Sequence, residues 1–331
     1  MSEPFNRAPA GYDILQRLGA GRTAVVWLAR DVGAEREVAL KLPRPDLQSD
    51  AVLRRMFENE VQITLKLDHP HVVRAYAGRS TGEGAFLALE YCAGGTLDQL
   101  LLERGRLPLE VAMRLVHEVA MGLAHTHDRR VLHRDVKPAN VFLDSDGRAK
   151  LGDFGTGTFQ VQDTEERVGT AFYMAPEVFE GRPTSVRSDV YSLGVLAYEV
   201  LGGERPFVGN SYEALMVAHL HSLPRDLKAV RPELPSMVPR VVARALSRDS
   251  ERRFADVASF LTAYREAAGI AASVALATPA PEASTLGRGG TRRANGTESV
   301  NEAGRSPTPK PTDGKATARP KRGWWPFGRR R

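Results

Sequence analysis

The sequence contains one cysteine, Cys92, among 331 residues, so no disulfide can form within the chain. Its apolar runs all fall short of the roughly 18 residues that a membrane-spanning helix needs. The first ten residues, MSEPFNRAPA, lack the apolar core of a secretory signal. These absences argue against a disulfide-stapled secreted protein and against an integral membrane protein. We therefore expect a soluble chain in the reducing environment of the cytoplasm.

Charge is distributed unevenly along the chain. Residues 271–331 hold 12 Lys and Arg but only 4 Asp and Glu, a net of +8, so the rest of the chain carries −2 of the total of +6. The same segment is dominated by Ala, Pro, Gly, Ser, Thr and Arg, which cannot bury enough apolar surface to offset the entropy of ordering. We expect an N-terminal extension at 1–11, a folded domain at 12–268 and a disordered tail at 269–331.

Hydrophobic periodicity divides the folded domain into two unequal parts. Short β-branched runs separated by glycines predict strands within 12–42, 71–77 and 85–91, and a helical period at 50–67 interrupts them. Beyond Gly94-Gly95, helices dominate, with predicted helices at 109–127, 185–201, 211–220, 235–246 and 255–267. The pattern indicates an α+β chain with a small β-rich lobe at 12–91, containing one helix, and a larger helical lobe at 92–268.

Several polar stretches interrupt these apolar runs, and each has an ordinary structural explanation when taken alone. The segment VLHRDVKPANVFLD at 131–144 fits either a solvated turn or a loop that positions a proton acceptor, a cation and a metal ligand. Gly19 and Gly21 fit either a hairpin turn or a flap that approaches phosphates closely. Lys41 in VALK fits a snorkelling surface lysine, and Glu60 fits a solvated helix residue.

Together these stretches, with LGDFG at 151–155 and APE at 175–177, occur in the order of the protein-kinase signature set. Over residues 12–268 the sequence resembles a eukaryotic-type (Hanks-type) serine/threonine protein kinase, of the kind common in bacteria. The resemblance implies a bilobal fold and transfer of the γ-phosphate of ATP, with Mg²⁺, to Ser or Thr hydroxyls of proteins. A pseudokinase scaffold that binds nucleotide and partner proteins is the alternative, and a small-molecule phosphotransferase fits the substrate segment less well.

The resemblance also implies a role for each motif residue. Asp135 would orient the attacking hydroxyl, and Lys137 would offset charge on the γ-phosphate. Lys41, paired with Glu60, would contact the α- and β-phosphates. Asn140 and Asp153 would hold Mg²⁺ through oxygen atoms. The expected nucleotide contacts are Leu18, Gly19, Ala20, Gly21, Val26, Ala39, Lys41, Glu90, Cys92 and Asp98, with Leu89 as gatekeeper.

Other residues would support the site or regulate it. The resemblance implies two structural roles. Glu177 would pair with Arg253, and Asp189 would hold the backbone of the loop that contains His133, Arg134 and Asp135. The activation segment offers Thr164 as the first phosphosite candidate, ahead of Thr156, Thr158 and Thr170, and Thr170 better fits a contact with the catalytic Asp and Lys. A transient homodimer could perform this autophosphorylation. Two residues depart from the family pattern. Ala24 replaces the third glycine of the glycine-rich loop, which predicts a stiffer flap. Thr64 replaces an apolar residue one turn after Glu60, which predicts a looser active arrangement.

The tail ends in GWWPFGRRR, which joins aromatic and basic residues. Trp favours membrane interfaces, and Lys or Arg adds attraction to anionic lipid. Residues 319–331 are therefore consistent with peripheral attachment to an anionic membrane, with a docking peptide for a partner protein, or with a solvated unstructured tail. No module for specific nucleic-acid recognition is evident, so we expect no nucleic-acid partner.

Overall fold

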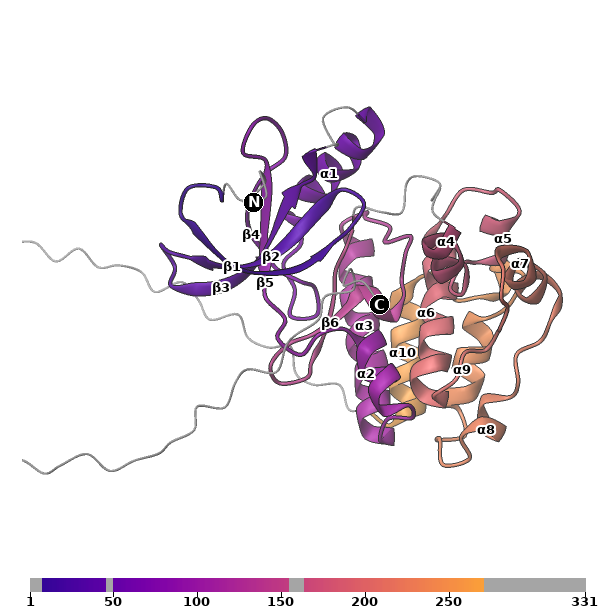
Figure 1. Cartoon of the computed structure of the whole chain (residues 1–331). Coiled ribbons are helices and arrows are strands. Elements are labelled where there is room, and N and C mark those ends of the chain that lie inside the picture. The colour runs from indigo at the N-terminus through magenta and orange to yellow at the C-terminus, as the bar shows by residue number, and fades with distance from the viewer. Residues whose placement is uncertain (1–7, 46–49, 155–163, 271–331) are drawn as a thin grey trace, which may run out of the picture. The chain divides into compact units, whose positions relative to one another are not determined.

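A computed structural model of the chain describes residues 8–45, 50–154 and 164–270 (Figure 1). The first lobe holds a five-stranded antiparallel sheet in the order β1-β2-β3-β5-β4, with one helix beside it. Its elements are β1 (Tyr12–Ala20), β2 (Ala24–Asp31), β3 (Arg36–Pro43), α1 (Ala51–Thr64), β4 (Ala75–Arg79) and β5 (Phe86–Glu90). The small β-rich lobe with a single helix is therefore confirmed.

Helix α1 begins where Asp50 caps it, since the Asp50 side chain accepts hydrogen bonds from the backbone N–H groups of Val52 and Leu53. The helix buries Met56, Phe57, Glu60, Val61 and Thr64. Apolar residues at helical spacing explain most of this face. Glu60 shares it, so the helix carries an acidic side chain toward the sheet and not toward solvent.

The second lobe is mainly helical, as predicted. It contains α2 (Leu97–Arg104), α3 (Leu109–Asp128), a short β6–β7 hairpin (Val141–Leu143 and Ala149–Leu151), α4 (Thr164–Ala171), α5 (Pro176–Phe179), α6 (Val186–Gly202), α7 (Tyr212–His221), α8 (Leu227–Val230), α9 (Val238–Ala245) and α10 (Val257–Ala268). Helix α6 is buried along all of Ser188–Gly202. It forms the centre of the core, with α3, α9 and α10 packed around it.

Two differences from the sequence prediction have local causes. Residues 71–74, expected to be part of a strand, instead run along β7, where Val73 N donates to Leu151 O and Leu151 N donates to His71 O, each at 2.9 Å. The helix expected at 235–246 begins at Val238, just before Pro239, because proline is suited to the first turn of a helix. Among the described residues, no helix has the length and apolar character needed to cross a membrane.

Candidate active site

Lys41 lies on β3 with only 5% of its surface exposed. Its Nζ donates to Asp153 Oδ1 at 3.0 Å and to the Glu60 carboxylate, so residues from β3, α1 and the loop after β7 meet at one ammonium. Burial by itself lowers the pKa of Lys41, but attraction to Asp153 and Glu60 outweighs burial and raises it. The ammonium is therefore charged and held in place by two carboxylates.

The two carboxylates respond differently to this environment. Burial raises the pKa of Glu60 and Lys41 opposes that shift, whereas for Asp153 the attraction to Lys41 outweighs burial and lowers the pKa. Asp153 also has a backbone φ of 68°, which is uncommon for a residue other than glycine. Such strain persists where the surroundings enforce it, commonly at functional sites.

The loop after α3 brings a second group of polar side chains together. Lys137 Nζ lies 2.7 Å from Asp135 Oδ2 and donates to Thr170 Oγ1 at 2.9 Å. Asn140 Nδ2 donates to Asp135 Oδ2 at 2.9 Å and to the backbone oxygen of Asp135 at 2.8 Å. The Asp135 carboxylate is thus oriented by an ammonium and an amide that both contact its Oδ2.

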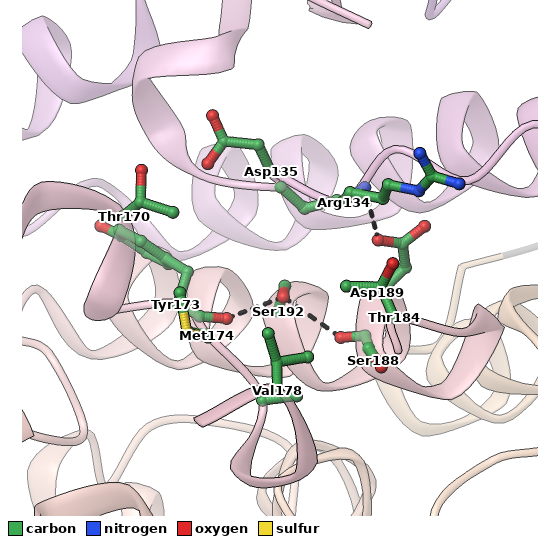
Figure 2. A pocket seen from close by; sticks show the side chains of 12 residues that line it. Arg134, Asp135, Thr170, Tyr173, Met174, Val178, Thr184, Ser188, Asp189 and Ser192 are labelled. Atoms are coloured by element: carbon green, nitrogen blue, oxygen red, sulfur yellow. Dashed lines mark hydrogen bonds between the residues drawn. The ribbon is translucent and has the colours of Figure 1, made fainter. Parts of the chain in front are cut away.

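Asp189 fixes the backbone of this loop from below. Its carboxylate accepts a hydrogen bond from Arg134 N at 2.8 Å (Figure 2). It also accepts one from His133 N at 2.8 Å, and His127 Nε2 lies 2.8 Å from it. The Arg134 backbone has a φ of 66°, so these bonds hold a strained turn directly before Asp135. His127 therefore contacts the residue that supports the loop and not Asp135 itself.

Buried contacts around His133 and Glu177 complete the framework. His133 Nε2 lies 3.1 Å from Gly152 O, and the His133 ring packs on Phe154 at a centroid distance of 5.0 Å. Glu177 on α5 accepts two hydrogen bonds from the Arg253 guanidinium, at 2.8 and 2.7 Å, and one from Ser188 Oγ at 2.8 Å. Burial raises the pKa of Glu177, but the bonds from Arg253 outweigh it and lower the pKa.

The apolar residues among the expected nucleotide contacts lie in one cluster together with the expected gatekeeper, Leu89. Leu18, Val26, Ala39, Leu89 and Cys92 are all buried and pack with Ala24 and Phe142, the last from the second lobe. Ala24, at the third glycine position, is buried, and its carbonyl oxygen accepts a bond from Gly21 N at 2.8 Å. A methyl group therefore fills space within the cluster at this position.

The segment that joins the lobes is fixed by polar contacts. Glu90 N donates to Arg74 O at 2.8 Å, and Glu90 Oε1 lies 3.0 Å from Lys150 Nζ. Burial raises the pKa of the Cys92 thiol to about 12, so this cysteine is a small apolar side chain and a poor nucleophile. Asp98 lies in the first turn of α2. Gly19 and Ala20 lie at the end of β1, paired with Val26 and Val25 of β2.

Thr64 occupies the position where the sequence predicted a looser arrangement. Its buried hydroxyl donates to the backbone oxygen of Glu60 at 2.7 Å. The hydroxyl is therefore satisfied within its own helix, one turn from the residue that pairs with Lys41. A small cavity lies beside it, lined by Thr64, Lys41, Glu60, Leu89, Val73, Phe142, Gly152 and Asp153.

The side chains present fit a magnesium nucleotide. Asn140 and Asp153 offer oxygen ligands, the type that Mg²⁺ prefers, and phosphate oxygens and water commonly complete its shell. Lys41 and Lys137 supply two positive charges for phosphates. Within the described residues, no group of three or more His, Cys, Asp or Glu side chains is placed to hold a metal ion.

A second pocket opens beside Asp135 (Figure 2). Its other lining residues include Thr170, Tyr173, Met174 and Val178 from the segment around α5, and Ser188, Asp189 and Ser192 from α6. Ser192 Oγ donates to Tyr173 O at 2.7 Å and so fixes this segment to the central helix. The pocket is placed where a substrate segment could present a hydroxyl to Asp135.

Some predicted residues lie beyond what the structure describes. Thr164 is the first residue of α4, whereas Thr156, Thr158 and the tail at 271–331 fall outside the described residues. Two residues next to Tyr173, Glu199 and Arg205, were missed by sequence reasoning, because no motif marks them and the contact of Glu199 with Tyr173 joins distant parts of the chain.

Comparison with known proteins agrees with this geometry. The family model of the protein kinase domain matches residues 12–263. The chain is 35% identical over 260 residues to serine/threonine-protein kinase PknA of Corynebacterium glutamicum, covering 75% of this chain and 54% of that protein. It is 32% identical over 252 residues to PrkC of Bacillus subtilis, covering 75% and 39% respectively.

Solved structures give the same result. The kinase domain of Mycobacterium tuberculosis PknI superposes with a TM-score of 0.62 at 30% sequence identity, covering 81% of this chain and 100% of that domain. The chain spans about half, or less than half, of the length of PknA and PrkC. The similarity therefore concerns the kinase domains of these longer proteins.

Proposed function

Since this chain belongs to the protein kinase family, of the Hanks type found in bacterial serine/threonine kinases, we propose that it transfers the γ-phosphate of ATP to Ser or Thr hydroxyls of proteins. The observation that carries the proposal is the meeting of Lys41, Glu60 and Asp153 at one buried ion cluster. Phosphoryl transfer depends mainly on positioning and on stabilising charge, and this cluster supplies both.

Each residue has a defined part in this proposal. Lys41, held by Glu60, binds the α- and β-phosphates. Asp135 accepts a hydrogen bond from the substrate hydroxyl and aligns it for attack, and Lys137 beside it offsets negative charge on the transferred group. Thr170 holds Lys137 in place. Mg²⁺, bound by Asp153 and Asn140, would neutralise phosphate charge.

The proposal is tested by comparing wild type with Asp135→Asn in transfer of labelled phosphate from Mg·ATP to a protein substrate. Removal of the acceptor carboxylate should lower kcat by about 10²–10⁴-fold, while nucleotide affinity, measured separately, stays within a few-fold. Asp146→Asn, at an exposed aspartate paired with Arg148, is the matched control and should leave kcat unchanged. Equal incorporation in wild type and Asp135→Asn would remove Asp135 from the mechanism. Absence of transfer by the wild type would favour a nucleotide-binding scaffold.

The partners of the whole protein belong to the same proposal. We infer protein substrates, and autophosphorylation at Thr164 through a transient homodimer. We also propose that the basic aromatic end, residues 319–331, directs the kinase to an anionic membrane or to a docking protein. Fusion of residues 300–331 to a fluorescent protein tests this, since a uniform cytosolic signal would exclude membrane attachment.

A further inference from the structure

Four side chains outside the signature motifs meet at Tyr173, which lines the pocket beside Asp135. The Tyr173 hydroxyl donates to Glu199 Oε2 at 2.5 Å, and Arg205 Nε donates to Glu199 Oε1 at 2.9 Å. The Arg205 guanidinium lies over the Phe172 ring, 4.1 Å from its centroid. One carboxylate is thus bound by a phenol that lines this pocket and by a guanidinium.

Charge makes this cluster more than a packing contact. Glu199 is buried on α6, and burial raises its pKa, whereas Arg205 and Tyr173 oppose the shift and Asp98 adds to it. Asp98, in the first turn of α2, is therefore close enough for its charge to act on Glu199. Without Arg205, the Glu199 carboxylate beside Tyr173 would have no cation in this cluster.

An acidic group in such a place attracts basic side chains of a substrate, because complementary charge determines which partners bind. Here the chain supplies its own cation. The Arg205 side chain remains 32% exposed while its Nε is used by Glu199. A guanidinium has five N–H donors in a planar fork, and the Phe172 ring holds that plane. The cluster therefore presents positive charge outward.

We infer that Arg205 is a specificity-determining residue: it prevents Glu199 from binding basic side chains, and it selects substrates with Asp or Glu close to the acceptor hydroxyl. The inference rests on the proposed kinase function. Charge-assisted pairs between arginine and carboxylate are stronger than neutral hydrogen bonds and are directional. One such contact is sufficient to discriminate between acidic and basic substrates.

Peptides with Glu, Ala or Lys at each position around one Ser or Thr test the inference through kcat/KM. At one or more of these positions the wild type should favour Glu over Lys by at least about tenfold, the size of one charged hydrogen bond. Arg205→Ala removes the cation that pairs with Glu199, so at the peptide positions where the wild type favours Glu, the variant should favour Lys. Adding Glu199→Gln to Arg205→Ala should remove the new preference for Lys.

Arg225→Ala is the matched control, because Arg225 is an exposed arginine that also pairs with a single carboxylate, Glu204. Its charge profile should equal that of the wild type. A wild type that favours Lys or is indifferent to charge would overturn the inference, as would an unchanged profile in an active Arg205→Ala. Arg205→Gln provides the same comparison if Arg205→Ala does not fold. A wild type that phosphorylates no peptide or protein would contradict the proposed function itself.

Discussion

At the scale of single residues, the site depends on compensation between buried charges. Lys41 forms ion pairs with two carboxylates, from Glu60 and Asp153, that have little access to water. Breaking a buried ion group by removing one member leaves an uncompensated charge, which costs more than the intact group contributes. Lys41 should therefore matter for stability as well as for binding phosphates.

We predict that Lys41→Met lowers the free energy of unfolding by about 3–5 kcal/mol at pH 7.5, with a smaller loss at pH 5. Without Lys41, burial and Asp153 raise the pKa of Glu60 further above its unfolded value. A carboxyl group shifted in this direction favours the folded state at low pH, and that stability is lost as pH rises through the folded pKa. Urea unfolding at both pH values measures the difference.

Lys66→Met, at an exposed lysine just after α1, is the control and should change stability by less than about 0.5 kcal/mol. The same loss for Lys41→Met at pH 5 and pH 7.5 would contradict the proposed ionisation of Glu60.

The sequence identifies the motif residues because their types and order are tied to one chemistry. Asp135, Lys137 and Asn140 are close in the chain, and a shared loop brings them together. Sequence could not identify the contact of Glu199 with Tyr173, because that contact depends on how α6 meets the segment before α5. Nor did it predict that the Thr64 hydroxyl is satisfied by its own helix.

At the scale of elements, the bounds of the long periodic helices were predicted well, but the segments with which short strands pair were not. The helices expected at 109–127 and 185–201 appear as α3 and α6 with nearly the same bounds, since each has a strong apolar period. The strand expected at 71–77 is shortened because His71 and Val73 bond to Leu151. A β-branched run does not specify which hairpin it will join.

The close contact between Gly122 of α3 and the backbone of His71 predicts the effect of a substitution on stability. A Cβ added at Gly122, within α3, would lie 2.2 Å from His71 O, a backbone atom that cannot turn aside. Gly122→Ala should therefore lower the free energy of unfolding by roughly 1–3 kcal/mol, although alanine normally favours a helix. Gly169→Ala, in α4 where no atom lies within 4 Å, is the control and should be neutral or stabilising by up to about 1 kcal/mol. Thermal unfolding of both variants tests this, and equal effects would contradict it.

At the scale of the whole kinase domain, three imidazoles meet where the first lobe contacts α3. His69 and His71 precede β4, and His125 lies on α3, with ring centroids 5.6 Å apart for His69 and His71 and 4.8 Å for His69 and His125. Burial, with further contributions from His125, His71, Arg129 and Lys150, lowers the pKa of His69 to about 4. The His69 ring is therefore neutral at pH 7.

This arrangement predicts that acid weakens the domain before most carboxylates titrate. The unfolded chain binds a proton at His69 near pH 6.5, whereas the folded chain does so near pH 4, so stability is lost as pH falls between these values. His69→Gln removes that proton and should flatten the decline in the free energy of unfolding from pH 6.5 to pH 4.5, measured with urea at each pH. His221→Gln, at an exposed histidine on α7, should keep the wild-type slope. If the free energies of unfolding of His69→Gln and wild type fall in parallel as the pH is lowered, protonation of His69 is not the cause of the acid sensitivity of the domain.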